Sequence, residues 1–594
     1  MKTLRASLLV AVFPALGLNA QLPSREAQAQ FSVAHTPSSN AVLNAAPQQA
    51  VTPEVSSYAE RLLKDHGIPG ITLGFVRVGE DGSVATELAG WGNMTEDGMP
   101  VTPETMFSIG SCSKAFMSAA MGLLIDDFAH GRNVTQLPVG VKSLTWQTKV
   151  QDLLPAEDWE LADEWATEKL SLIDAMSHVS GLPRHDMAYS RQDTPKSVIK
   201  RMKHMRPYYE LRERYSYNNQ MFMLVQHVHE IYAGKPLPEF VEERIFSPLN
   251  MTTATYSGRE AEDSGHLSQG FAAGRRIPYW FGDDLPSRMI AGAGGVIATP
   301  LDMTKWLATL LNEGVNPTTG ETVIPEDIFR QLTTMYTIAS GKPNKPRNSI
   351  SGYGTAWARM SIQGHDVVWH SGGLPGFYSE AWFFPEDHIG VFTSENSDGP
   401  ASYALALRVA EAYLNLELTP APDVPSPNQE SSDSSPTPPT DFEVDVLHSY
   451  TGTYTNPGYG KFTLCTTTAS DIQGCATILD TYASTADGPL DAAVLYGEFM
   501  PARIWATQFR MRPTAAAEFV LEAEQIFPRG YGRNETPFSL AMSPSGTPVR
   551  CVRKGSAVVG CGLMDIGLAG EGDMTWKRRE GGVEDIADAW FVKL

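Results

Sequence analysis

A serine and a lysine one helical turn apart are the first residues whose types and spacing suggest chemistry. In "MFSIGSCSKAFM", Ser111 precedes Lys114, and Cys112 and Ser113 lie between them. Apolar residues recur at helical spacing from Ser111 onward, so the pattern predicts a helix that begins at Ser111 and carries Lys114 on the same face. The helix dipole and a nearby ammonium both stabilise an alkoxide. Ser111 is therefore the candidate nucleophile.

The two residues between them are expected to have structural roles. On the helical wheel, Cys112 and Ser113 point away from Lys114, so we expect them to pack or to cap the helix. A nucleophilic Cys112 is the alternative, but an exposed thiol on an exported enzyme would risk oxidation. Because a serine three positions before a lysine recurs by chance in long chains, the pattern needs support from other segments.

Two further segments supply that support. In "RERYSYNNQMFML", Tyr217 and Asn219 stand at the start of another apolar helical run, and in "VVWHSGGLPGFYSE", His370, Ser371 and Gly372 stand where a strand is expected to meet a glycine turn. With three boxes of these types in this order, the sequence resembles the serine β-lactamase and penicillin-binding-protein superfamily. With a tyrosine in the second box and a histidine in the third, the sequence is similar to the class C β-lactamase-related esterases, D-amino-acid peptidases and acyltransferases.

The resemblance covers residues 53–418 and continues in the tail. "DAMSHVSGLPRHD" (174–186) resembles the family's stretch between the first and second boxes, and "AGAGGVIATPLDMTKWLATLL" (291–311) resembles the glycine-rich turn and helix before the third. "YTGTYTNPGYGKFTL" (450–464) resembles the lipocalin-like β-domain appended to some members.

The resemblance implies a mechanism through an acyl-enzyme. Ser111 would attack the carbonyl carbon, and Lys114 and Tyr217 would share the proton transfer. Which of the two holds the proton is open at this point. Asn219 would hydrogen-bond Lys114 and the acyl side chain of the substrate.

The third box would supply the oxyanion hole. By the resemblance, the backbone N–H groups of Ser111 and of Gly373, just beyond Gly372, would stabilise the oxyanion, and such donors contribute about 3 kcal/mol each. His370 would assist proton transfer or hold the substrate. A neutral imidazole binds a carboxylate less well than the lysine ammonium of penicillin-directed enzymes, which argues against β-lactamase activity itself.

The elements that must position these residues are predicted to be mixed. The patterns indicate a helix over 53–67, a hairpin over 71–92, a second hairpin over 378–395 and a helix over about 400–416. Strands at both ends with helices between them predict one antiparallel sheet closed by distant segments, which is an α+β fold and not a doubly wound parallel one. The resemblance adds a helical subdomain.

The rest of the chain is predicted to contain a linker and a small all-β domain. Residues 419–442 are dense in Pro, Ser and Asp, which indicates an extended linker. Within 443–594, residues 450–468 and 538–554 each have the pattern strand, tight turn, strand, so the tail is expected to be a barrel or sandwich.

The N-terminus has the features of an export signal. In residues 1–20 two basic residues precede a short apolar run that ends in small residues. The run is too short to span a bilayer. Residues 21–52 are small and polar and are interpreted as a leader arm, so the mature protein is expected to be secreted.

Cysteines and glycosylation sequons also fit secretion. The four tail cysteines predict two local disulfides, although four cysteines permit three pairings. The cysteines are Cys465, Cys475, Cys551 and Cys561, and the sequon asparagines are Asn93, Asn133, Asn250 and Asn534.

Composition and missing motifs exclude several classes. With 46 basic and 68 acidic residues, the net charge of −22 repels nucleic acid and anionic membranes. His227 and His229 would point apart on a helix, so we expect no metal, and His178 and His185 are expected to support loops. The chain has neither the G-x-S-x-G elbow nor G-x-G-x-x-G spacing, and no cofactor is expected.

The sequence therefore predicts an exported serine hydrolase without metal or cofactor. Its substrates would be small esters, amides or lactams, or peptides, including those with a D-residue. Transfer of the acyl group to an alcohol or amine is an alternative, and a catalytically silent binding or scaffold protein is a hypothesis from another class. The β-tail has three candidate roles: covering the mouth of the active site, binding a partner, or stabilising the chain.

Overall fold

The computed structural model describes residues 48–282, 284–399, 401–421, 444–469, 472–542, 546–566 and 580–594. Residues 49–594 belong to one unit. The predicted signal peptide lies outside the described residues, as do most of the leader arm and most of the linker.

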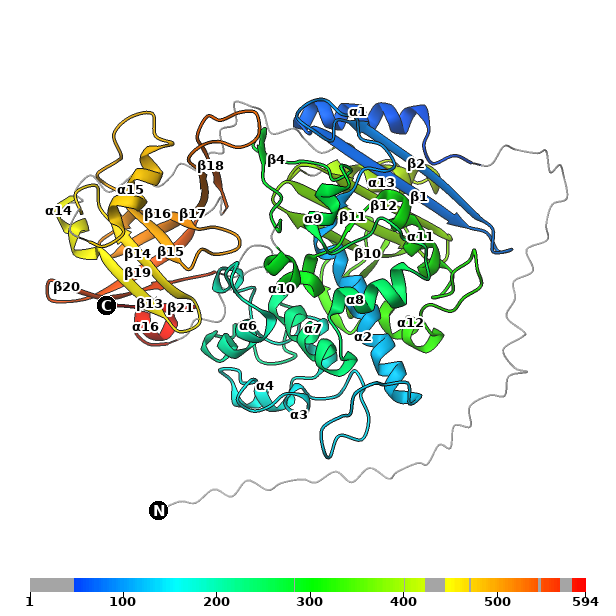
Figure 1. Cartoon of the computed structure of the whole chain (residues 1–594), viewed down its shortest axis with the longest axis horizontal. Coiled ribbons are helices and arrows are strands. Elements are labelled where there is room, and N and C mark those ends of the chain that lie inside the picture. The colour runs from blue at the N-terminus through cyan, green and yellow to red at the C-terminus, as the bar shows by residue number, and fades with distance from the viewer. Residues whose placement is uncertain are drawn as a thin grey trace, which may run out of the picture. The chain divides into compact units, whose positions relative to one another are not determined.

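An eight-stranded antiparallel sheet with the order β2-β1-β12-β11-β10-β9-β8-β7 forms the centre of the first part of the chain (Figure 1). β1 (Gly70–Val78) pairs with both β2 (Val84–Gly92) and β12 (Ile389–Glu395), so distant segments close the sheet. This confirms the predicted α+β class. The other strands are β7 (Thr337–Ser340), β8 (Ser351–Tyr353), β9 (Ala358–Ile362), β10 (His365–Leu374) and β11 (Phe377–Phe384).

Helices cover both faces of this sheet (Figure 1). α1 (Pro53–His66) and α13 (Ala401–Tyr413) pack on one face, where the fully buried Trp382 belongs to their shared core. α11 (Pro300–Leu311) packs on the other face, against β1, β11 and β12. Gly67 ends α1 as predicted, in the left-handed conformation with φ 64° that favours glycine.

A helical part packs beside the sheet. α2 (Lys114–Ala129), α7 (Asn219–Ala233) and α10 (Asp284–Gly294) contact one another. The remaining helices are α3 (Val150–Leu153), α4 (Glu164–Lys169), α5 (Leu172–Met176), α6 (Pro195–Arg201), α8 (Leu237–Val241), α9 (Gly258–Asp263), α12 (Glu326–Thr333), α14 (Val444–Leu447), α15 (Cys475–Ala483) and α16 (Val583–Ile586).

Two of the glycines before α11 do not lie in the expected turn. Gly292 and Gly294 lie in the last turn of α10. A Cβ atom on Gly292 would lie 3.0 Å from Met117 Sδ and 3.2 Å from the Phe222 carbonyl oxygen, so glycine allows α10 to approach α2 and α7 closely. The chain leaves the helix only at Gly295, so the turn is shorter than the sequence predicted, because a glycine that permits close helix packing has the same sequence signature as one that permits a turn.

The C-terminal part forms a closed eight-stranded antiparallel barrel, because β16 pairs with both β15 and β17. This confirms the predicted all-β domain. Ring centroids of Tyr454, Phe509 and Phe591 lie 5.0, 5.4 and 4.7 Å from that of Phe462, so aromatic side chains fill part of the interior. The strands are β13 (Gly452–Asn456), β14 (Gly460–Cys465), β15 (Leu495–Met500), β16 (Gln508–Ala515), β17 (Glu518–Phe527), β19 (Thr547–Lys554), β20 (Ala557–Leu563) and β21 (Ala589–Lys593).

Only one of the two hairpins predicted in the tail forms. β13 pairs with β14 as expected. β18 (Phe538–Ala541) and β19 instead both pair with β17, along residues 524–527 and 518–521 respectively. The pattern over 538–554 therefore predicted the strands correctly and their pairing wrongly, since alternation identifies a strand but not its partner.

Both predicted local disulfides are present. Cys465 pairs with Cys475 and Cys551 with Cys561, each across a separation of 10 residues. The first joins the end of β14 to the start of α15, and the second joins neighbouring strands β19 and β20. This connectivity is one of the three that four cysteines permit.

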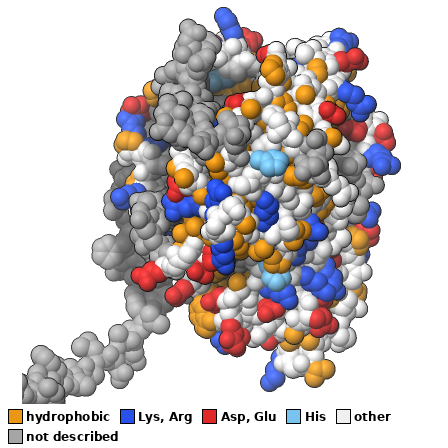
Figure 2. Space-filling view, turned by 90° about the vertical axis from the view of Figure 1, so that its left-hand side faces the viewer, with side chains coloured by type: hydrophobic (Ala, Val, Ile, Leu, Met, Phe, Trp, Pro, Cys, Tyr) orange, Lys and Arg blue, Asp and Glu red, His pale blue; other side chains and the backbone are white. Residues whose placement is uncertain are grey.

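The surface is mixed in character. Figure 2 shows basic, acidic and hydrophobic side chains interspersed on one face of the molecule. Among the helices of the described ranges, every one is too short or too polar to cross a membrane. Of the four sequon asparagines, Asn93, Asn250 and Asn534 are exposed, whereas Asn133 is half-buried and its Nδ2 donates to the Thr135 carbonyl oxygen at 2.7 Å.

Candidate active site

Lys114 lies directly behind Ser111 at the start of α2. Ser111 belongs to the 3₁₀ turn Gly110–Ser113, and Lys114 is the first residue of α2 and is fully buried. Lys114 Nζ lies 3.1 Å from Ser111 Oγ, 2.8 Å from Asn219 Oδ1 and 2.7 Å from the Ala293 carbonyl oxygen. The fold thus brings the serine, the lysine and the asparagine of two separate boxes into contact.

A neutral amine can make these three contacts, as can an ammonium with its three N–H donors. A neutral amine has two N–H donors and one lone pair, so the amide and carbonyl oxygens accept the two N–H groups and the lone pair faces the hydroxyl of Ser111. Burial lowers the pKa of Lys114 well below its ordinary value. The Arg184 guanidinium lowers this pKa further, and the Asp186 carboxylate opposes both effects. The net shift favours the uncharged amine.

Tyr217 lies beside this amine with its hydroxyl buried. The ring centroid lies 4.8 Å from Lys114 Nζ and 4.4 Å from the guanidinium carbon of Arg184. Within the described residues, the hydroxyl has no hydrogen-bond partner. Burial raises the pKa of Tyr217, and the smaller effects of Arg184 and the Ser111 hydroxyl do not cancel this rise. The resting side chain is therefore a phenol.

A chain of hydrogen bonds runs from Lys114 to the barrel. Asn219, whose Oδ1 holds Lys114, donates through Nδ2 to Asp186 Oδ1 at 3.2 Å. The Tyr189 hydroxyl donates to the same carboxylate oxygen at 2.7 Å, and Trp505 Nε1 donates to that hydroxyl at 2.9 Å. Because Trp505 lies between β15 and β16, the C-terminal domain contributes to the support of Lys114.

His370 has protein partners on both ring nitrogens. Nδ1 lies 2.5 Å from the Ser371 carbonyl oxygen and Nε2 lies 2.9 Å from the Tyr353 hydroxyl. Burial lowers the pKa of His370 to about 3, so the ring is neutral, with Nδ1–H donating and Nε2 accepting. The ring is 6 % exposed. The geometry favours a structural role over contact with substrate.

The glycines of the third box lie inside a strand. β10 continues to Leu374, so the strand does not end at His370 as expected. A Cβ atom on Gly372 would lie 1.9 Å from the Ile109 carbonyl oxygen and 2.9 Å from the Ser111 amide nitrogen. Glycine therefore lets β10 contact the turn that carries Ser111.

The residues between Ser111 and Lys114 have the structural roles predicted for them. Cys112 is buried, its Sγ lies 3.3 Å from the His370 carbonyl oxygen, and burial raises the pKa of the thiol well above its usual range. Ser113 Oγ accepts the Val296 N–H at 2.9 Å. A buried protonated thiol is a poor nucleophile, which argues against the cysteine alternative.

Ser111 opens onto a cavity of about 430 Å³ that both parts of the chain line. We call it the active-site cavity. The residues before the linker are Ser111, Arg184, His185, Asp186, Met187, Asn219, Ile290, Ala293, Gly294, Gly373 and Leu374. Those from the C-terminal part are Tyr459, Phe499, Trp505, Leu521, Ala523, Met542, Thr547, Leu563 and Ile566.

The sequence patterns do not identify four residues that surround Lys114 or support it through hydrogen bonds: Arg184, Asp186, Tyr189 and Trp505. The first two belong to the segment 174–186 that resembles the family, so a signal existed but assigned them no role. Trp505 lies 316 positions from Tyr189, and nothing local to either residue predicts their contact.

The other histidines have packing roles. His229 is buried, its ring centroid lies 4.6 Å from that of Phe240, and burial lowers its pKa to about 3. The ring of His178 packs against that of Tyr217 with 4.2 Å between centroids and a tilt of 37°, and His185 Nδ1 lies 2.5 Å from the Tyr459 hydroxyl. In the part of the chain that the structure describes, no group of three or more His, Cys, Asp or Glu could hold a metal.

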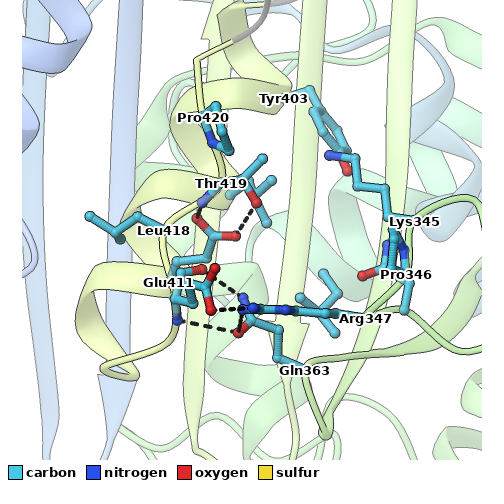
Figure 3. A pocket seen from close by; sticks show the side chains of 13 residues that line it. Lys345, Pro346, Arg347, Gln363, Tyr403, Glu411, Leu418, Thr419 and Pro420 are labelled. Atoms are coloured by element: carbon cyan, nitrogen blue, oxygen red, sulfur yellow. Dashed lines mark hydrogen bonds and ion pairs between the residues drawn. The ribbon is translucent and has the colours of Figure 1, made fainter.

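A second hollow of about 220 Å³ lies beside the end of α13 (Figure 3). Its polar groups bond one another: Arg347 pairs with Glu417, Gln363 Nε2 donates to the Glu417 carbonyl oxygen at 2.8 Å, and the Thr419 N–H donates to Glu411 at 2.7 Å. Its lining residues include no serine, cysteine or histidine. The candidate site is therefore the cavity at Ser111.

The chain is similar to several known proteins. The Beta-lactamase family model matches residues 55–415. An unguisins hydrolase of Aspergillus campestris (strain IBT 28561) is 28% identical over 433 residues, which cover 67% of this chain and 74% of that protein. A D-aminopeptidase of Gluconobacter oxydans (strain 621H) is 26% identical over 347 residues, which cover 57% of this chain and 58% of that protein.

A solved structure has a similar fold over most of the chain. The octameric penicillin-binding protein homologue from Pyrococcus abyssi superposes with a TM-score of 0.51 at 18% identity, covering 91% of this chain and 99% of that one. This likeness shows the fold alone.

Proposed function

The chain belongs to the Beta-lactamase family, and from this premise we propose that it is a serine hydrolase that cleaves amide or ester bonds through an acyl-enzyme on Ser111. The observation that carries the proposal is the distance of 3.1 Å between Ser111 Oγ and Lys114 Nζ, with Nζ held by two further oxygens, those of Asn219 and Ala293. A nucleophile within hydrogen-bond reach of a base, which a third group orients, is the arrangement that acyl transfer requires.

In the proposed acylation, Lys114 accepts the hydroxyl proton of Ser111 as Oγ attacks the carbonyl carbon. The backbone N–H groups of Ser111 and Gly373 stabilise the oxyanion. The Tyr217 phenol then donates its proton to the leaving nitrogen or oxygen, the scissile bond breaks, and protonated Lys114 restores the proton of Tyr217. The proton that Ser111 loses is thereby balanced by the one that the leaving group gains.

In the proposed deacylation, water attacks the acyl-enzyme and the same groups return the proton to Ser111. An alcohol or amine in place of water would give acyl transfer. We assign His370 a positioning role, because its two hydrogen bonds tie β10 to Tyr353 and leave no nitrogen for substrate.

The relatives support an amide or peptide substrate. One is named an unguisins hydrolase and others are named D-aminopeptidases, so peptides that contain a D-residue belong to the proposed substrate class. The two disulfides support the proposal that the protein is exported, since disulfides persist in oxidising compartments.

A fluorophosphonate tests the proposed nucleophile. Intact-mass spectrometry after incubation with ethyl fluorophosphonate is expected to show one adduct, and peptide mapping is expected to place it on Ser111. Ser113→Ala is the matched control and is expected to keep the adduct, because Ser113 lies in the same turn but its hydroxyl is bonded to the Val296 N–H. An adduct that maps to Cys112 would contradict the assignment, and no adduct in any sample would favour the scaffold hypothesis.

The pH dependence of kcat/KM tests Lys114 as the base. Activity is expected to fall as pH falls through the pKa of Lys114, because protonation removes the lone pair. Asp186 raises this pKa and Arg184 lowers it. Asp186→Asn is therefore expected to move the acid limb of the profile to lower pH, and Arg184→Gln to move it to higher pH.

Because the two variants are expected to shift the pH profile in opposite directions, an electrostatic effect can be distinguished from damage to the fold. They are measured with p-nitrophenyl butyrate between about pH 5 and pH 10, since the profile of kcat/KM reports groups of the free enzyme. Two shifts in the same direction, or unchanged profiles, would show that Lys114 is not the group that titrates.

A further inference from the structure

The barrel side of the active-site cavity is almost entirely apolar. Phe499, Leu521, Ala523, Met542 and Leu563 line it from the C-terminal part of the chain. Leu521 and Ala523 alternate along β17 with half-buried Val520 and Glu522, so their side chains point to the inside of the barrel.

The polar atoms of the aromatic residues on this side are already bonded. The Tyr459 hydroxyl lies 2.5 Å from His185 Nδ1, and Trp505 Nε1 donates to the Tyr189 hydroxyl at 2.9 Å. A molecule in the cavity therefore meets their rings and not their polar atoms. Thr547 is the exception among the barrel residues, as it brings a hydroxyl to the lining.

The opposite side of the same cavity carries the polar and reactive groups. Ser111, Arg184, Asp186 and Asn219 line it from the first part of the chain, together with apolar residues such as Ile290 and Leu374. The cavity thus has one side of mixed character that holds the candidate nucleophile and one side that is almost entirely apolar, within one volume of about 430 Å³. This size lies in the range of roughly 300–1,000 Å³ that is typical of small-molecule sites.

We propose that the inner face of the barrel is the specificity surface of the enzyme and binds a bulky apolar group of the substrate while the scissile carbonyl lies at Ser111. This inference rests on the proposed function and deepens it by naming the substrate class: amides or esters with a large aliphatic or aromatic group near the scissile bond. Burial against the apolar side chains of the barrel supplies the binding energy, since the apolar area removed from water is the main favourable contribution there.

A series of p-nitrophenyl esters tests the proposal on the full-length protein. For the wild type, kcat/KM is expected to rise roughly fourfold for each added methylene from acetate through butyrate to hexanoate, the value that corresponds to burial of one CH₂ group. The p-nitrophenyl monoester of glutarate, which carries a carboxylate at similar length, is expected to lose this gain because its charge would be desolvated.

Two variants locate the surface. Ala523→Phe fills the cavity and Thr547→Glu places a charge in its wall, and each is expected to lower the hexanoate-to-acetate ratio of kcat/KM by at least about tenfold. Thr547 is half-buried, so Thr547→Glu is expected to disrupt folding less than Ala523→Phe. Ala557→Phe is the matched control, because Ala557 is exposed and pairs with Lys554, at the end of β19 away from Thr547.

The outcomes separate this inference from the proposed function. If the wild type is labelled by ethyl fluorophosphonate but its kcat/KM does not depend on the chain length of the ester, the proposed specificity surface is wrong and the serine hydrolase stands. The same holds if the wild type is labelled and both variants retain its hexanoate-to-acetate ratio. A wild type that neither labels nor hydrolyses any ester would overturn both. A chain-length preference lost in both variants and kept in Ala557→Phe would support the proposal.

Discussion

Replacing Lys114 with Met is expected to lower kcat/KM for p-nitrophenyl butyrate by about 10²- to 10⁴-fold, the contribution typical of a positioned general base. Met is one atom shorter than Lys and can occupy most of the buried space beside the ring of Phe222, whose centroid lies 5.1 Å from Lys114 Nζ. It lacks the lone pair that accepts the proton of Ser111. The same fall is expected in the rate of fluorophosphonate labelling, because labelling also requires an activated hydroxyl.

The control for this variant is Lys203→Met, which removes an exposed lysine paired only with the exposed Glu160. It is expected to leave both rates unchanged. Lys114→Met also leaves the oxygens of Asn219 and Ala293 without their donor, at a cost of roughly 1–3 kcal/mol each, so thermal unfolding must be measured alongside. A folded Lys114→Met protein that labels at the wild-type rate would remove Lys114 from the mechanism.

Replacing Gly372 with Ala is expected to lower kcat by about 10²- to 10³-fold, the effect of losing one oxyanion donor. The added methyl would lie 1.9 Å from the Ile109 carbonyl oxygen and 2.9 Å from the Ser111 amide nitrogen. Real contacts cannot be so short, so β10 must move away from the turn that carries Ser111. We expect this movement to displace the N–H groups of Ser111 and Gly373, which are the proposed oxyanion donors.

Gly341→Ala is the matched control for that substitution, because no atom lies within 4 Å of the position its Cβ would take. Steady-state kinetics and fluorophosphonate labelling are measured for both variants. We expect Gly372→Ala to lose turnover more than substrate affinity, since the oxyanion forms only during reaction. Wild-type kcat in Gly372→Ala would show that the close approach of β10 to Ser111 has no part in the reaction.

Local features of this protein follow from short stretches of sequence. Alternation and turn residues predict the hairpin of β1 and β2 and that of β11 and β12, since a two-residue period and a tight turn are local properties. Gly67 ends α1 because the residue at that position adopts the left-handed conformation, which favours glycine. Ser111 and Lys114 share a helix face for the same reason: their spacing alone sets their proximity.

Part of the candidate site was also predictable, because the three boxes resemble those of a known family. The resemblance placed Asn219 against Lys114, and their contact is 2.8 Å. It did not predict the environment of His370 on β10, whose Nε2 bonds the hydroxyl of Tyr353 on β8, two strands away in the sheet. Nor did it identify Asp186, because a carboxylate in a loop acquires a role only from the groups that the fold places beside it.

Three kinds of feature follow only from tertiary structure: which strands pair, how Lys114 is protonated, and which residues join the two parts of the chain. The partner of a strand depends on the whole sheet, so β18 and β19 both pair with β17 and not with each other. The protonation of Lys114 depends on burial and on charges from other segments. The contact of Trp505 with Tyr189 and the shared lining of the cavity join residues hundreds of positions apart. Local spacing and periodicity were enough to predict the candidate reactive residues and the class of fold. Only the folded chain determined how those residues are charged and what surrounds the substrate, because both depend on long-range packing.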